Sequence, residues 1–257
     1  MNYTELRYEV TNSVAWIRLN RPERLNAWTR VLEEEFHAAC QAAGADEGVR
    51  AIAVTGEGRG FCAGADMSLL SGAAESGGST VLHRDYSWLA RLGKPVIAAV
   101  NGHCVGLGFV IALHCDVRLA ADTAKFSTIF AKRGLIAEYG LAWTLPRLVG
   151  AGRALDLLLS ARLFDGSEAA RIGLVEHVFP EVEFAARARA YVEEMAQGVS
   201  PRSTKVMKAQ VYAALEQPLE EAVARAHEEM LPSLACEDFR EGVAHFLEKR
   251  PPRFTGR

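Results

Sequence analysis

Short apolar runs alternate with amphipathic stripes along the first 200 residues, and this alternation limits the fold more than any other feature of the chain. Three of the runs are typical of strands: Val14–Leu19, Ala51–Thr55 and Lys94–Val100. A further strand is expected at 115–121, and helices are expected at 31–43, 79–92 and 106–114. Strands that alternate with helices predict an α/β fold with parallel strand pairing.

The pattern changes after residue 200, where the strand-like runs stop. Ser200 and Pro201 suit the N-cap and the first position of a helix. Beyond them, apolar residues recur every three or four positions, as on helix faces: Leu219, Val223, Ala226 and Met230, then Phe239, Val243, Phe246 and Leu247. We expect residues 1–200 to form a core and residues 201–257 a helical region whose apolar faces pack on that core or on another subunit.

Composition and charge argue against several classes of protein. With 257 residues, of which 49% are hydrophobic, the chain can bury a sizeable core. The net charge of −3 gives no sign of a nucleic-acid or anionic-membrane surface. The N-terminus lacks the apolar core of a signal peptide, and the longest apolar run, 105–113, is far shorter than the roughly 20 residues that span a membrane. We therefore expect a soluble, cytoplasmic protein without nucleic-acid or membrane partners.

The five cysteines do not form a disulfide or zinc pattern. Their number is odd, and no C-x-x-C occurs. The pairs His103-Cys104 and His114-Cys115 are poor candidates for metal ligands, because adjacent side chains on a strand point to opposite faces. We expect no metal site.

Two stretches leave the backbone almost bare of side chains: G-E-G-R-G-F-C-A-G-A-D at 56–66 and N-G-H-C-V-G-L-G-F at 101–109. Neither matches a nucleotide-phosphate loop, and no G-x-S-x-G nucleophile elbow occurs in the chain. Two strand-to-helix turns can each offer backbone N–H donors to a single oxygen, which is the construction of an oxyanion hole. Ordinary tight packing at two such turns also explains the glycines, and on spacing alone it is the better explanation.

Two segments resemble the signature segments of the crotonase, or enoyl-CoA hydratase/isomerase, superfamily: F-C-A-G-A-D and N-G-H-C-V-G-L-G-F-V-I-A-L-H-C-D. The loop L-N-R-P-E-R-L-N-A is similar to the CoA-binding loop of the family, and K-P-V-I-A-A-V-N-G, residues 134–150 and R-E-G-V-A-H-F-L-E-K-R also fit its pattern. The resemblance covers essentially the whole chain. It implies a crotonase-like core of repeated ββα units over residues 1–200, which binds acyl-CoA, and a helical trimerisation region at 201–257.

The resemblance implies that the substrate is an acyl thioester of coenzyme A, so that coenzyme A is part of the substrate and no separate cofactor is required. The thioester carbonyl would accept hydrogen bonds from the backbone N–H groups of Ala65 and Leu107. The family often has glycine at the second position, but leucine carries the same N–H donor. Each donor aimed at the developing enolate oxygen can contribute about 3–4 kcal/mol.

Other positions match substrate contacts of the family. Besides the two oxyanion donors, the resemblance implies contacts with substrate or CoA at Arg24, Leu25, Ala27, Ala63, Asp66, Met67, Phe246 and Lys249. Arg24 is expected to pair with a phosphate, and Asp66 to cap its loop rather than to react. Phe246 and Lys249 match positions that help to cover the adenine and phosphate, often from a neighbouring subunit.

Five further residues are weaker candidates. Trp88, Leu89 and Trp143 suggest an apolar pocket for the acyl chain. His83 lies where the family has a helix over that pocket, and we interpret it as an exposed helix residue rather than an acid or base. His103 is interpreted as a packed residue of the second turn.

The two glutamates with which hydratases of this family hold and activate water are absent. The matching positions are Val110 and Phe130, neither of which can accept or donate a proton. Ordinary hydration of a 2-enoyl-CoA is therefore not favoured. A different carboxylate, Glu138, lies in G-L-I-A-E-Y-G. Isomerases of the superfamily, including 3-enoyl-CoA isomerases and ring-opening epoxide isomerases, have an acidic residue in the matching segment, where Ala137 here replaces the usual proline.

One carboxylate suffices for isomerisation, because it can remove a proton from C2 and return it at C4, or the reverse. Apolar neighbours such as Phe130, Ile136 and Trp143 are expected to raise the pKa of Glu138. The leading hypothesis is an enoyl-CoA isomerase of fatty acid metabolism that assembles as a homotrimer or a dimer of trimers. The alternatives are a hydratase (a lyase) with other acid or base residues, and an acyl-CoA-binding protein without turnover.

Overall fold

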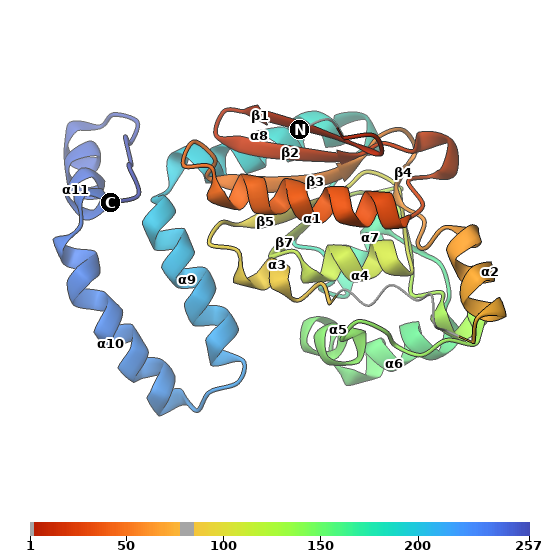
Figure 1. Ribbon diagram of the computed structural model, residues 1–257. Coiled ribbons are helices and arrows are strands. Elements are labelled where there is room, and N and C mark those ends of the chain that lie inside the picture. Colours follow the sequence, from red (N-terminus) through yellow and green to blue (C-terminus); the bar gives the residue numbers. More distant parts are fainter. Residues whose placement is uncertain (1–2, 78–84) are drawn as a thin grey trace.

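The computed structural model of the chain describes residues 3–77 and 85–257, and its strands form two sheets (Figure 1). The larger sheet has the strand order β1-β2-β3-β5-β7-β10. These strands are Leu6–Thr11, Val14–Leu19, Ala51–Gly56, Val96–Val100, Val117–Ala121 and His177–Phe179. Strands β1 and β2 pair antiparallel, and all other pairs in this sheet are parallel, which confirms the predicted α/β class.

The smaller sheet has the order β4-β6-β8-β9, with the strands Gly60–Cys62, His103–Val105, Lys125–Ser127 and Phe164–Asp165. A short strand of this sheet follows each of the long strands β3, β5 and β7 within a few residues. The chain therefore winds as repeated ββα-like units, as the resemblance implied. The expectation of two direct strand-to-helix turns was wrong, because β4 and β6 intervene, pair in parallel and bring the two bare-backbone segments together.

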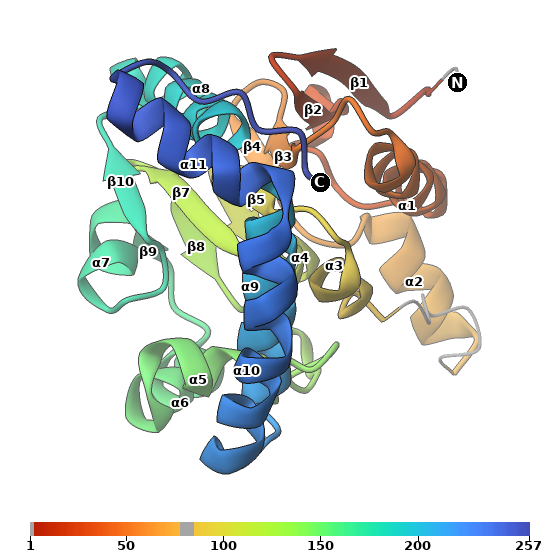
Figure 2. The same ribbon diagram turned by 90° about the vertical axis from the view of Figure 1, so that its left-hand side faces the viewer.

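Helices α1 (Arg30–Ala45) and α8 (Glu181–Gly198) lie on opposite sides of the larger sheet (Figures 1 and 2). The Thr29 side chain caps α1 by accepting a 3.0 Å hydrogen bond from the Leu32 N–H. The predicted apolar stripe of Leu32, Phe36 and Cys40 is fully buried. Helix α4 (Leu107–His114) is buried at all eight residues, so it forms the centre of the core rather than a surface layer.

The remaining elements of the core connect these layers. They are the 3-10 turns η1 (Pro22–Arg24) and η2 (Phe130–Arg133) and the helices α2 (Met67–Glu75), α3 (Trp88–Arg91), α5 (Leu141–Val149), α6 (Ala151–Ser160) and α7 (Gly166–Arg171). The helix predicted at 79–92 is seen as α3 alone, since residues 78–84, with His83, lie outside the described residues. None of the described helices is long and apolar enough to cross a membrane.

Three helices follow residue 200: α9 (Pro201–Ala214), α10 (Leu219–Ala235) and α11 (Glu237–Glu248). The Ser200 side chain accepts a hydrogen bond from the Ser203 N–H at 3.1 Å, which confirms the predicted N-cap. Figures 1 and 2 show α9 and α10 side by side at one end of the molecule. The predicted apolar faces of α10 and α11 do not pack on the core: Leu219 is 75% exposed, Met230 49% and Phe246 77%.

Candidate active site

A cavity of about 450 Å³ opens where the two glycine-rich segments meet the segment between η2 and α5. It brings the predicted oxyanion donors, Ala65 and Leu107, together with Glu138. Five other predicted contacts also line it. The full lining is Arg24, Ala27, Ala63, Gly64, Ala65, Asp66, Met67, Leu69, Leu70, Ala73, Val105, Gly106, Leu107, Ile129, Phe130, Arg133, Leu135, Glu138 and Tyr139.

The first donor lies on the segment that follows β4. The Trp28 N–H donates to the Gly64 carbonyl at 2.8 Å, and the Asp66 N–H donates to the Trp28 carbonyl at 2.9 Å. In this parallel bridge Trp28 bonds the two neighbours of Ala65, so the Ala65 N–H itself takes no part in the pairing. Gly64 has φ +98, a conformation that favours glycine, and it turns the chain so that the cavity reaches the backbone. The Ala65 N–H has no acceptor among the described residues.

The second donor is the first residue of α4. Gly106 has φ +54 and caps the helix, while its N–H donates to the Ser127 carbonyl at 3.0 Å. The Leu107 N–H belongs to the first turn of the helix, where backbone donors lack intrahelical partners, and within residues 3–77 and 85–257 it donates to no acceptor. A Cβ built on Gly64 would lie only 3.7 Å from the Leu107 nitrogen, so the two donor segments are in contact.

Several of the glycines serve backbone packing rather than the cavity. A Cβ at Gly56 would lie 1.9 Å from the Gly60 carbonyl oxygen, and one at Gly102 would lie 2.1 Å from the Arg59 carbonyl oxygen. Of the two explanations of the bare backbone, tight packing therefore holds for Gly56 and Gly102. Close approach to the cavity holds for Gly64 and Gly106, which line it.

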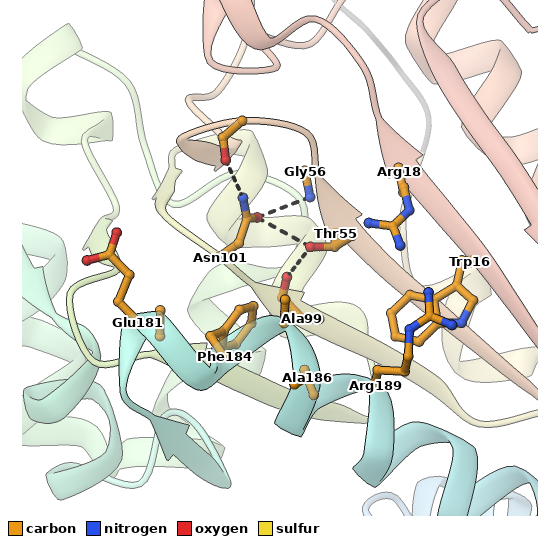
Figure 3. A pocket seen from close by; sticks show the side chains of 14 residues that line it. Trp16, Arg18, Thr55, Gly56, Ala99, Asn101, Glu181, Phe184, Ala186 and Arg189 are labelled. Atoms are coloured by element: carbon orange, nitrogen blue, oxygen red, sulfur yellow. Dashed lines mark hydrogen bonds between the residues drawn. The ribbon is translucent and has the colours of Figure 1, made fainter.

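The Asn101 side chain holds the start of the first glycine-rich segment by hydrogen bonds, as Figure 3 shows. Its Oδ1 accepts from the Gly56 N–H at 3.1 Å and from Thr55 Oγ1 at 3.3 Å. Its Nδ2 donates to the Gly58 carbonyl at 2.9 Å. All of the polar atoms of this side chain are used, so Asn101 fixes the backbone that leads to Ala65.

Figure 3 also shows a second cavity, of about 480 Å³, between the larger sheet and α8. Its two arginines already face carboxylates: Arg18 Nε lies 3.9 Å from Glu57 Oε1, and Arg189 Nη1 lies 3.2 Å from Glu193 Oε1. None of the predicted site residues lines this second cavity, whereas eight of them line the first one. Among the described residues, no cluster of three or more His, Cys, Asp or Glu side chains is arranged to hold a metal ion.

Asp66 is the N-cap of α2, as expected. Its Oδ1 accepts from the Ser68 N–H at 3.1 Å, and its Oδ2 accepts from Arg21 Nη1 at 3.0 Å. The Ser68 N–H and the Arg21 guanidinium favour the carboxylate, and they hold the pKa of Asp66 below its ordinary value. A carboxylate stabilised in this way is a weak base. This agrees with Asp66 holding its loop in place rather than transferring a proton.

Glu138 is half-buried, and burial raises the pKa of its carboxyl group above the ordinary value. Its carboxylate forms no hydrogen bond or ion pair within the part of the chain that the structure describes. Of the three expected apolar neighbours, only Phe130 lines the cavity. Ile136 and Trp143 do not line it, and they are 79% and 38% exposed, so they contribute little to an apolar wall around the Glu138 carboxyl group.

The two positions that match hydratase glutamates differ in their placement. Phe130 lines the cavity and is 5% exposed, whereas Val110 is 1% exposed and lies behind the lining. Both are apolar, and Asp66 and Glu138 are the only carboxylates among the described lining residues. Since Asp66 is held by Ser68 and Arg21, Glu138 is the carboxylate available for proton transfer.

Some predicted contacts do not line the cavity. The Leu25 carbonyl accepts from the Ala63 N–H at 3.0 Å, so Leu25 supports the cavity wall from outside. Phe246 and Lys249 lie on and after α11, at the opposite end of the chain's fold from α2 (Figure 1). Their contacts with CoA stay predictions.

The weaker candidates also lie elsewhere. Leu89 is fully buried, the Trp88 ring packs 4.9 Å from that of His37, and Trp143 stacks with Arg147. They do not line the cavity, whose apolar wall includes Leu69, Leu70, Ala73, Ile129, Leu135 and Tyr139. His103 lies half-buried in β6, outside the lining.

The sequence interpretation missed Arg133, the second cation of the lining after Arg24. It lies three residues after Phe130 in the same turn, η2. Arg133 could have been found from the sequence because it lies close to Phe130, which had already been matched to a site position. Leu69 and Leu70 could have been found in the same way, because they lie three and four residues after Asp66 of the A-G-A-D segment.

Comparisons with known proteins agree with this geometry. The family model described as enoyl-CoA hydratase/isomerase matches residues 9–257. A "probable enoyl-CoA hydratase" of Rhodobacter capsulatus is 42% identical over the whole of both chains, and the 1,2-epoxyphenylacetyl-CoA isomerase of Escherichia coli is 33% identical over 96% of this chain and 97% of its own. The crystal structure of an enoyl-CoA hydratase from Bacillus anthracis has a TM-score of 0.91 at 28% identity, over 99% of this chain and all of that one.

The match spans nearly the whole sequence, and the relatives align with this chain from end to end. The sequence match and the fold point to one family. The chain belongs to the enoyl-CoA hydratase/isomerase family.

Proposed function

We propose that the protein is an enoyl-CoA isomerase that moves a carbon–carbon double bond next to a CoA thioester. One observation carries the proposal: a carboxylate without a partner among the described residues, Glu138, faces the same cavity as two backbone N–H groups without acceptors there, those of Ala65 and Leu107. A base and an oxyanion hole are the two components that proton transfer beside a thioester requires.

In this mechanism the thioester carbonyl accepts hydrogen bonds from the Ala65 and Leu107 N–H groups. The Glu138 carboxylate removes a proton from C2 of a 3-enoyl-CoA, and the negative charge spreads to the thioester oxygen. The protonated Glu138 then delivers the same proton to C4. The C2–H bond breaks, a C4–H bond forms and the double bond moves from C3–C4 to C2–C3. The raised pKa of Glu138 suits a group that must both take and return a proton.

Hydration is the second candidate, since several relatives carry hydratase names. Adding water across the double bond requires a group that activates the water and a group that protonates the neighbouring carbon. The lining offers Glu138 for one of these tasks, while Val110 and Phe130 occupy the positions matched to the hydratase pair. Because Asp66 is held by Ser68 and Arg21, the described lining offers no second carboxylate for proton transfer, which favours isomerisation over hydration.

The substrate in this proposal is an acyl-CoA, and coenzyme A enters only as part of it. Arg24 lines the cavity with Ala27, and in this proposal its guanidinium would pair with a CoA phosphate. The exposed apolar faces of α10 and α11 support assembly into a homotrimer or a dimer of trimers, in which Phe246 and Lys249 would reach the site of a neighbouring copy.

A paired turnover assay on the purified protein tests the proposal. One cell receives a 3-enoyl-CoA and the other a 2-enoyl-CoA, and the ultraviolet absorbance of the conjugated thioester is followed in both. We expect the absorbance to rise in the first cell and to stay constant in the second. Glu138→Gln should abolish the rise, whereas Glu75→Gln, an exposed carboxylate outside the cavity, should leave it intact.

Two results would contradict isomerisation. A fall of absorbance in the second cell, with 3-hydroxyacyl-CoA as the product, would establish hydration. Tight binding of both ligands without turnover, unchanged in Glu138→Gln, would identify a binding protein instead.

A further inference from the structure

One buried titratable side chain outside the cavity contacts the loop that carries Glu138. His114 is the last residue of α4 and is 8% exposed. Its Nε2 lies 2.9 Å from the carbonyl oxygen of Tyr139, the residue after Glu138. A carbonyl oxygen can only accept, so Nε2 carries the hydrogen and donates it.

The loop at Glu138 has a backbone that needs such support. Tyr139 has φ +53 and Gly140 has φ +76, so two consecutive residues are left-handed and the first of them is not glycine. A bulky residue in this region is strained and persists only where its surroundings hold it. Besides the His114 bond, the Tyr139 ring packs edge-on at 5.5 Å from the buried ring of Tyr86.

Helix α4 links the two halves of the proposed site. Its first residue, Leu107, supplies an oxyanion donor, and its last, His114, holds the Tyr139 carbonyl. The two ends of such an eight-residue helix lie about 10 Å apart, and every residue between them is buried. A rigid helix of this kind fixes the distance from the donors to the loop that bears the base.

We propose that His114 is a positioning residue, which directs Glu138 into the cavity by holding the carbonyl of Tyr139. This inference rests on the proposed part of Glu138 as the proton carrier. The hydrogen bond does not require a particular charge on the imidazole, because both the neutral ring protonated at Nε2 and the imidazolium can donate from that nitrogen. Burial holds the pKa of His114 below its ordinary value, and the Tyr139 carbonyl and Asp85, which lies before α3, act in the opposite direction.

Three variants test this inference. His114→Leu fills the space without a donor, and His114→Gln offers a side-chain N–H at a similar reach. Leu113→Ala truncates the neighbouring buried residue of α4, outside the cavity lining, and therefore reports general loosening of the helix. We expect His114→Leu to lower kcat between about tenfold and a hundredfold with little change in KM, since a small displacement of a reacting group has effects of this size.

The pH profile separates positioning from simple destabilisation. A Glu138 that leaves the cavity loses the burial that raises its pKa, so the acid limb of kcat should move to lower pH in His114→Leu. His114→Gln should restore most of kcat and the original limb. Leu113→Ala should lower the melting temperature without moving the limb.

The outcomes distinguish this inference from the proposed function. Wild-type kcat and an unmoved acid limb in His114→Leu, with Glu138→Gln inactive, would overturn the part of His114 and leave the isomerase proposal standing. An equal kcat loss and limb shift in Leu113→Ala would also overturn it. An active Glu138→Gln enzyme would overturn the proposed function and this inference together.

Discussion

Gly108 of α4 faces the carbonyl oxygen of Cys62 in β4 so closely that a Cβ on Gly108 would lie 2.3 Å from that oxygen. Cys62 also pairs with Cys104 of β6 in the smaller sheet. The start of α4 is therefore pressed against the strand that leads to Ala65. This contact, between backbones and without any polar side chain, sets the spacing of the two candidate oxyanion donors.

Gly108→Ala should consequently damage both stability and turnover. The added methyl group must push α4 away from β4, and overpacking of this kind costs about 1–3 kcal/mol of unfolding free energy. We expect a lower urea midpoint and a reduced kcat, because the Leu107 N–H moves with the helix. Gly152→Ala is the matched control, since Gly152 lies in α6 with open space around it and should become slightly more stable. A Gly108→Ala enzyme with wild-type stability and kcat would contradict this packing argument.

The raised pKa of Glu138 predicts how stability depends on pH. In the folded protein, burial disfavours the charged carboxylate, so the pKa of Glu138 is higher than in the unfolded chain. Its contribution to stability is fully present below the unfolded pKa and is lost as pH rises through the folded pKa. At neutral pH, Glu138→Gln should therefore be at least as stable as the wild type while losing activity.

Thermal melts of the two proteins across the acidic range measure this linkage. The advantage of Glu138→Gln should shrink as pH falls toward the ordinary value for a glutamate. A variant that is less stable than the wild type at neutral pH would mean that the carboxylate is stabilised in place. In that case, the Glu138 carboxylate would have a stabilising partner, contrary to the hydrogen bonds found among the described residues.

Much of the core could be predicted because its signals are local. Val14–Leu19 was predicted to be a strand and is β2, and α1 extends the predicted helix by only one residue at its start and two at its end. A run of apolar residues and a helical stripe each specify their own element, whatever lies around them. The paired glycine-rich segments could likewise be assigned to one site.

The small sheet and the cavity wall could not be predicted in the same way. Strands β4 and β6 have three residues each, which is too short for any periodic pattern, and they exist because they pair with each other. Trp143 was expected to help form an apolar pocket but does not line the cavity, and left-handed backbone at Tyr139 and Gly140 turns the chain before α5 begins. Sequence proximity is a poor guide where such turns intervene.

Lys208 ties the C-terminal helices to the core. Its Nζ lies 2.7 Å from Asp116 Oδ2 and donates to the carbonyls of Leu89 and Lys94 at 3.0 Å. The side chains of Lys208 and Asp116 are only 8% and 15% exposed. Lys208→Met should destabilise the protein by about 3–5 kcal/mol, because it leaves a buried carboxylate without its cation.

Urea unfolding of Lys208→Met measures this loss. Lys132→Met, at an exposed position of η2, serves as the control and should stay within about 0.5 kcal/mol of the wild type. If the two variants are equally stable, the ion pair contributes nothing net, and α9 must be held by its other contacts.

The exposed apolar residues of α10 predict the state of assembly. Leu219 and Leu231 are 75% and 69% exposed, and a face of this kind on a folded chain marks a surface that another protein covers. We expect sedimentation to give a mass three or six times the 28.0 kDa of one chain. Leu231→Glu should shift that mass toward a single chain, because three or six buried carboxylates without partners oppose the contact. Val182→Glu, at an isolated and 95% exposed position on α8, should leave the mass unchanged. A wild-type protein that sediments as one chain at micromolar concentration would show that this face stays open, and Phe246 and Lys249 would then have no route to any active site.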